Sequence, residues 1–94
     1  MRFADLLVRR ALPPATFHHR ALGFILDAAW PDRMVGAEVD GWGKYTQRAQ
    51  FQNQIERDAL LESAGWRIFH FTWRDVTKRE GYVASILRQA LRLR

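Results

Sequence analysis

Three carboxylates, Asp27, Glu38 and Asp40, constrain this chain more than any other feature of its sequence. They lie at the ends of two short apolar segments that a turn signal separates. The segments are residues 22–26 and 34–37, and the turn is residues 30–33. A hairpin of this length brings Asp27 close to Glu38 and Asp40. Carboxylates packed together repel one another, and a divalent cation is the commonest reason for such a group. The alternative is that the acids are solvated at strand ends or cap turns.

The acids belong to a basic chain. It has 94 residues, with 15 Lys plus Arg against 10 Asp plus Glu, which gives a formal net charge of +5. A basic surface that carries a metal-binding group of acids suits a polyanionic substrate, because the surface attracts phosphates and the metal acts on one of them. Basic small domains are also common, so the charge alone leaves a nucleic-acid partner open.

Composition excludes several classes of protein. A hydrophobic content of 48% and an aromatic content of 13% predict a globular chain of one domain. The absence of cysteine excludes disulfides and thiolate metal sites, and it fits a reducing compartment, so we expect a cytoplasmic protein. No apolar run approaches the roughly 20 residues of a membrane span, so we expect no membrane partner.

Hydrophobic periodicity predicts the order helix, strand, strand, helix, strand, helix. On the long helix we expect Phe51, Ile55, Ala59 and Leu61 to point inward, with Gln50, Gln54 and Arg57 on another side. The resulting fold class is α/β, a small mixed β-sheet flanked by helices. The predicted elements are a helix over 3–11, an irregular or extended approach over 16–20, strands over 21–27 and 34–40, a helix over 47–63, a strand over 66–73, a loop or helical turn over 75–78 and a helix over 82–91.

An ordered set of short segments runs through nearly the whole chain. The segments are Asp27–Pro31, Ala37–Trp42, Arg57–Leu61, Ala64–Arg67 and Phe71–Trp73. Together they resemble the Vsr-like (very-short-patch-repair-like) endonuclease family of the PD-(D/E)XK nuclease superfamily. The resemblance implies a restriction-endonuclease-like core and a single domain over residues 1–94, shortened at its N-terminus.

The resemblance also implies a function. It implies a metal-dependent DNA endonuclease that hydrolyses phosphodiester bonds in repair, restriction or a mobile element. Asp27, Glu38 and Asp40 would hold Mg or Mn together with the carbonyl of Val39, since hard oxygen ligands in an open site suit these ions. The same three acids would be catalytic, with Lys44 stabilising the transition state or orienting water.

Four residues are candidates for contact with nucleic acid. Lys44 and Arg57 offer positive charge, Gln54 lies one helical turn from Arg57, and Trp42 in a glycine-flanked loop suits stacking on a base or sugar. The alternatives are a solvated loop lysine, a solvated helix face and a tryptophan that covers the edge of the core.

Three departures from the family pattern support a different function. Many relatives have a histidine where this chain has Tyr45, and an acid where it has Gln54. Many also have a glutamate in the N-terminal helix, which this chain lacks. These departures favour a catalytically impaired nuclease-fold DNA-binding module, in a toxin–antitoxin or regulatory context. A structural or partner-binding fragment is a third hypothesis. His70, between Phe69 and Phe71, is expected to be a hydrogen-bonded structural histidine.

Overall fold

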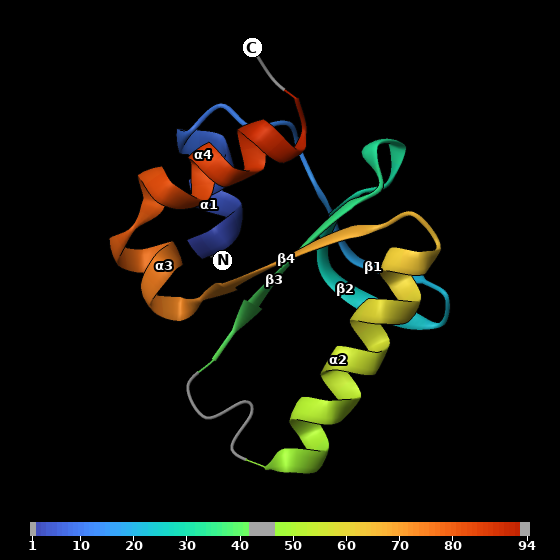
Figure 1. Cartoon of the computed structure of the whole chain (residues 1–94). Coiled ribbons are helices and arrows are strands. Elements are labelled where there is room, and N and C mark those ends of the chain that lie inside the picture. Colours follow the sequence, from blue (N-terminus) through green and yellow to red (C-terminus); the bar gives the residue numbers. More distant parts are fainter. Residues whose placement is uncertain (1, 42–46, 93–94) are drawn as a thin grey trace.

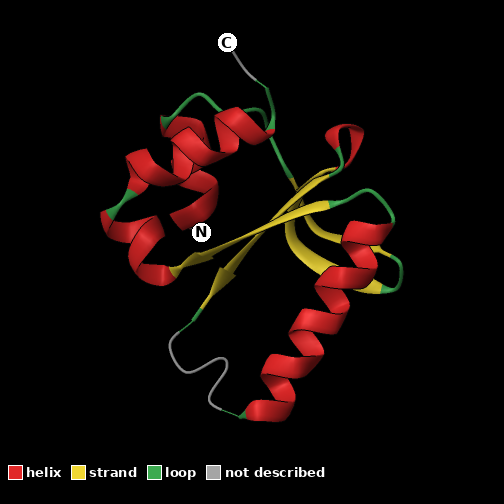
Figure 2. Cartoon of the chain, in the orientation of Figure 1, coloured by secondary structure: helices red, strands yellow, loops and turns green. Residues whose placement is uncertain are grey.

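The computed structural model describes residues 2–41 and 47–92, which form a small mixed α/β fold (Figure 2). Its elements are α1 (Arg2–Arg9), β1 (Thr16–Ala21), β2 (Phe24–Trp30), the 3-10 turn η1 (Pro31–Arg33), β3 (Val35–Asp40), α2 (Arg48–Ser63), β4 (Arg67–Thr72), α3 (Trp73–Lys78) and α4 (Glu80–Ala90). The predicted α/β class with a mixed sheet is confirmed. None of the helices in the described part is both long and apolar enough to cross a bilayer.

The sheet has four strands in the order β1-β2-β3-β4. β2 is antiparallel to both β1 and β3, whereas β3 and β4 are parallel and are joined through α2. The parallel register places Glu38 beside His70 and Asp40 beside Thr72. Two polar residues that are 32 positions apart in the sequence, Glu38 and His70, are thereby neighbours on one face of the sheet.

The first strands differ from the prediction in their bounds. Residues 16–20, predicted as an irregular or extended approach, are extended and form most of β1, an edge strand that pairs with β2. β2 itself covers 24–30 rather than 21–27, because Leu22 and Gly23 form the tight turn of a hairpin, with φ of 51° and 81°. A two-residue turn with positive φ at both positions suits paired strands, but leucine rarely adopts a positive φ, so Leu22 and Gly23 do not form a recognisable turn signal.

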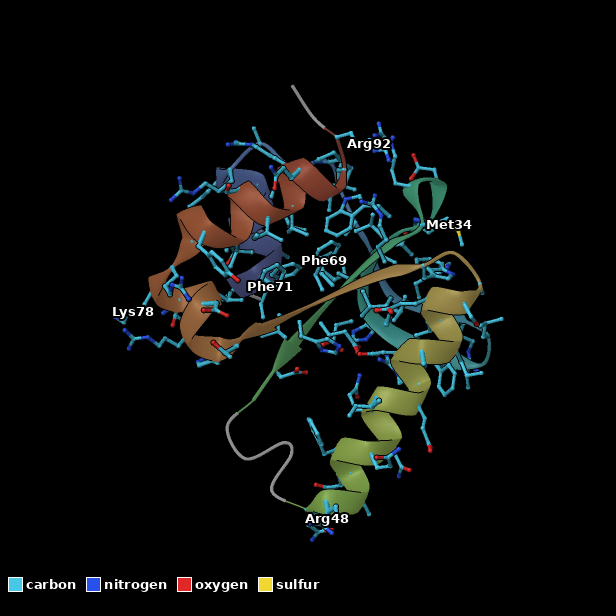
Figure 3. All side chains as sticks on the ribbon, viewed as in Figure 1. Met34, Arg48, Phe69, Phe71, Lys78 and Arg92 are labelled. Carbon is cyan, nitrogen blue, oxygen red and sulfur yellow. The ribbon has the colours of Figure 1, made fainter. Side chains whose placement is uncertain are left out.

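Helices cover both faces of the sheet, with α1, α3 and α4 gathered on one face and α2 lying on the other (Figure 1). Phe69 and Phe71 point from β4 towards the three-helix side (Figure 3). The larger core cluster lies there, and its fully buried members come from α1, β3, β4, α3 and α4. They include Phe3, Leu6, Val35, Phe71, Val76, Val83 and Leu87. This core fixes one face of the sheet and leaves the other for a more polar contact.

The orientation predicted for α2 was right for Leu61 but wrong for Phe51, Ile55 and Ala59. Phe51 and Ile55 are 51% and 48% exposed, and of the α2 residues Leu61 alone is buried. The partly buried positions are instead Gln54, Arg57 and Asp58. The physical reason is the sheet beneath them: a helix packed over buried carboxylates must present groups that hydrogen-bond to those carboxylates.

The junction between β4 and α3 is closed by a capping box. The Thr72 hydroxyl accepts from the Asp75 N–H at 3.0 Å, and the Asp75 carboxylate accepts from the Thr72 N–H at 2.9 Å. The hydrogen bond from the Thr72 N–H, helped by the Thr72 hydroxyl and by Arg79, holds the pKa of the Asp75 carboxyl below its usual 3.8, although burial opposes the shift.

We predict that Asp75→Asn destabilises the protein by about 1 kcal/mol at pH 7, the usual contribution of a helix cap. A carboxyl with a lowered folded-state pKa stabilises the fold above its unfolded-state value, near 3.8, and this contribution disappears as the pH falls through the folded-state pKa. Urea unfolding of parent and variant at pH 7 and at pH 3 or below should show the difference shrinking on acidification. A difference that stays constant with pH would contradict an ionised cap.

Candidate metal site between the sheet and α2

The paired backbone of β2 and β3 ends just before Asp27 and Glu38. Regular pairing runs from Trp30 opposite Val35 to Ala28 opposite Ala37. Beyond this pairing, side-chain carboxylates accept the hydrogen bonds of the backbone N–H groups. The Asp27 N–H donates to Glu38 Oε2 at 3.4 Å, and the Val39 N–H donates to Asp27 Oδ2 at 3.0 Å. The predicted approach of Asp27 to Glu38 is therefore present, and each carboxylate satisfies a backbone donor of the neighbouring strand.

The alternation of side chains along β2 breaks at Asp27. Leu26 and Ala29 belong to the core cluster beneath α2, whereas Ala28 belongs to the cluster on the opposite face. In a regular strand Leu26 and Ala28 would share a face. Opposite Asp27, His18 of β1 has a φ of 54°, so the neighbouring strand is distorted at the same level. This local irregularity directs the Asp27 carboxylate sideways, towards β3.

Arg57 of α2 pairs with two acids, Glu38 of β3 and Asp58 of its own helix. Arg57 Nη1 lies 2.5 Å from Glu38 Oε1 and 3.1 Å from Asp58 Oδ1, and Nη2 donates to the Ile25 carbonyl at 3.1 Å. Glu38 is only 3% exposed. A carboxylate this deeply buried requires a partner, since an uncompensated buried charge costs several kcal/mol. Gln54 adds a further donor, with Nε2 at 2.9 Å from Asp58 Oδ1.

His70 connects one acid of β3, Asp40, to one acid of α2, Asp58. Its Nδ1 lies 3.0 Å from Asp40 Oδ2 and its Nε2 lies 2.6 Å from Asp58 Oδ2. A neutral imidazole has one N–H and can donate to one of these carboxylates, whereas the doubly protonated ring donates to both. The histidine is hydrogen-bonded, as expected of a structural residue, but its two partners are acids of the candidate site.

The most compact set of potential metal ligands in the described part of the chain is Glu38, Asp58 and His70. One ligand atom from each lies within 4.8 Å of the other two. Two carboxylate oxygens and one imidazole nitrogen are chemically suited to a divalent cation. Arg57 contacts two of the three residues, so a metal ion here must compete with its guanidinium for the carboxylates of Glu38 and Asp58.

The structure brings the predicted residues together in part. Asp27 contacts Glu38 and Val39 through backbone N–H groups, while Asp40, 9% exposed, reaches the site through His70. Among the described residues, Asp27, Glu38 and Asp40 are not gathered as a compact ligand set. Lys44 and Trp42 lie outside the described residues. Arg57 and Gln54, proposed as contacts for nucleic acid, here contact the acids.

Two residues of the site were not predicted, Asp58 and His70. Asp58 follows Arg57 and lies four positions after Gln54, so its helical neighbours did place it on the polar side of α2. His70 could have been found only from the register of β3 with β4, which sets it beside Glu38. Local sequence carries no signal for that register.

Comparison of the chain with protein-family models, with curated proteins and with solved structures finds no match. The resemblance to the Vsr-like family therefore stays a prediction from the sequence. The chemistry of the site is argued from its own residues.

We predict that Arg57→Met destabilises the protein by about 3 kcal/mol, because it leaves Glu38 buried without its cation. Adding Glu38→Gln to that variant should recover a large part of the loss, since glutamine still accepts from the Asp27 N–H but carries no charge. Urea unfolding of the four proteins of this double-mutant cycle measures the coupling. The matched control is Arg48→Met, on the exposed start of the same helix, which should stay within about 0.5 kcal/mol. Additive effects of the two site substitutions would contradict the ion pair.

Proposed function

We propose that this chain is a metal-dependent endonuclease that hydrolyses phosphodiester bonds in DNA. The observation that carries the proposal is the compact set of Glu38, Asp58 and His70, with Asp27 and Asp40 hydrogen-bonded to its members. The net charge of +5 supports a polyanionic substrate, because so many acids at one point of a basic chain leave the rest of its surface still more positive.

Glu38, Asp58 and His70 would hold the metal. Carboxylates suit Mg and Mn alike, whereas an imidazole ligand favours Mn or a later transition metal over Mg. When bound, such an ion supplies charge stabilisation to a phosphate and activates a water molecule at neutral pH. The carbonyl of Val39 would be an additional oxygen ligand, as the resemblance to the Vsr-like family implies.

Asp40 would orient His70 rather than hold the metal. The Asp40 carboxylate accepts from His70 Nδ1, which leaves Nε2 as the ligand atom. Histidine ligands in proteins are commonly fixed in this way by an outer carboxylate, which sets both the tautomer and the direction of the ring. Asp27 plays a comparable part for β3, because its bond to the Val39 N–H holds the strand next to Glu38.

Arg57 would change partners when the metal binds. In the structure its guanidinium compensates Glu38 and Asp58. If a divalent cation were held by those carboxylates, the Arg57 guanidinium would be released to bind the phosphate of the substrate, which it recognises with two parallel N–H donors. The bond from Arg57 to the Ile25 carbonyl would keep the guanidinium at the site.

One observation favours a second function, a nuclease-fold DNA-binding module without turnover. Arg57 already neutralises Glu38 and Asp58, so the acids are satisfied without a metal. If that ion pair persists in the presence of divalent cations, the chain binds DNA through its basic surface alone.

A combined binding and cleavage experiment tests the two functions. Calorimetry should show saturable Mn binding to the parent that is lost in Glu38→Gln and in His70→Asn. Plasmid DNA incubated with Mn should be nicked by the parent and not by Glu38→Gln, while both proteins retain the same affinity for DNA. Chelator should abolish the nicking.

The matched control is Glu62→Gln on the exposed side of α2, which removes the same charge. It should change neither Mn binding nor plasmid nicking. Metal binding with no cleavage would remove the endonuclease function but keep the metal site. Cleavage that persists in Glu38→Gln would place the active site elsewhere.

A further inference from the structure

A second polar site lies at the far end of the fold, where α4 ends. A cavity of about 400 Å³ is lined by three arginines, Arg33, Arg67 and Arg92, together with Ala90 and Leu91. The arginines come from η1, from the first residue of β4 and from just after α4. Figure 3 labels Arg92 at the end of α4, near the turn that Met34 follows. We call these three residues and the cavity the arginine pocket.

Two of the arginines are fixed by the backbone rather than by acids. Arg33 Nη1 donates to the Leu91 carbonyl, and Arg67 Nη2 donates to the Ala90 carbonyl. These carbonyls belong to the last turn of α4, where they lack helical partners. Each guanidinium has several further N–H donors, so these bonds hold the arginines in place without satisfying them.

Among the described residues, the positive charge of the pocket is not balanced by nearby acids. The C-terminus of a helix carries roughly half a negative charge, against three full positive charges here. Asp32 lies 3.9 Å from Arg33 Nε but is 81% exposed, so water screens it. No carboxylate of the described residues pairs with Arg67 or Arg92. Elsewhere the chain does neutralise arginines, with Glu80 between Arg9 and Arg10 and with Asp75 beside Arg79.

The pocket is separate from the metal site. Arg67 and His70 are three residues apart on β4, so their side chains point to opposite faces of the sheet. Arg67 bonds to α4 on the three-helix side, whereas His70 faces Asp58 of α2. A ligand of the arginine pocket therefore does not compete for Glu38, Asp58 or His70.

We propose that the arginine pocket binds a phosphate group. Three guanidinium groups lining one cavity suit a phosphate group, because each can offer paired N–H donors to two of its oxygens. The phosphate can belong to an internal phosphodiester of a nucleic acid, to a strand terminus or to a small phosphorylated compound. The proposal stands on the pocket alone and does not depend on metal binding or on cleavage.

The test is a titration of the ¹⁵N-labelled protein in the presence of chelator, followed by the Nε–Hε signals of its arginines. The first probe is inorganic phosphate, and the next are a 5′-phosphorylated hexanucleotide and its 5′-hydroxyl form. The signals of Arg33, Arg67 and Arg92 should move together and saturate with at least one probe. Arg92→Gln should lower the affinity for that probe about tenfold, because one charged hydrogen-bonding partner is lost. This variant leaves both bonds to α4 intact, so the fold is not at risk.

Arg74→Gln on the exposed face of α3 removes the same charge away from the pocket and serves as the control, with affinity unchanged. Tighter binding of the phosphorylated hexanucleotide would assign a terminal phosphate, equal binding of both forms an internal phosphodiester, and binding of inorganic phosphate alone a small compound. Each of these outcomes supports the pocket. Equal loss of affinity in Arg92→Gln and Arg74→Gln, or no saturable shift with any probe, would overturn it.

Discussion

The ion pair between Arg57 and Glu38 is the interaction on which the polar half of the structure depends. Glu38 is buried where β2 and β3 part, and α2 can lie over it only because Arg57 brings a compensating charge. The same guanidinium reaches Asp58 and the Ile25 carbonyl, and so ties α2 to the hairpin. The helix therefore presents its polar side to the sheet and leaves Phe51 and Ile55 half exposed.

The two faces of the sheet are held by different kinds of interaction. The three-helix side is an apolar core, whose burial supplies most of the stability. The α2 side combines a small apolar cluster around Leu61 and Trp66 with the charged network of Arg57, Glu38 and His70. Buried ion pairs contribute little net stability compared with apolar packing. Their presence at one place in so small a domain therefore supports the proposal of a metal site there.

The sequence predicted the hairpin and the meeting of Asp27 with Glu38, because the turn at Pro31–Arg33 and the two apolar segments are local signals. It did not predict the direction of α2, since apolar periodicity alone cannot reveal that the opposing sheet is polar. The sequence predicts only a structural role for His70, because its pairing beside Glu38 depends on the register of distant parallel strands. β1 was not predicted as a separate strand, because the turn between β1 and β2 places Leu22 at positive φ.

We propose that Glu38, Asp58 and His70 hold a divalent cation, and that Arg57 pairs with Glu38 and Asp58 when no cation is bound. Paramagnetic line broadening by substoichiometric Mn in the isotope-labelled protein tests this proposal. We expect the side-chain signals of those three residues to broaden first, and the Arg57 Nε–Hε signal to shift as its carboxylate partners are taken. Broadening confined to exposed acids such as Glu56 and Glu62, with Arg57 unchanged, would contradict the claim.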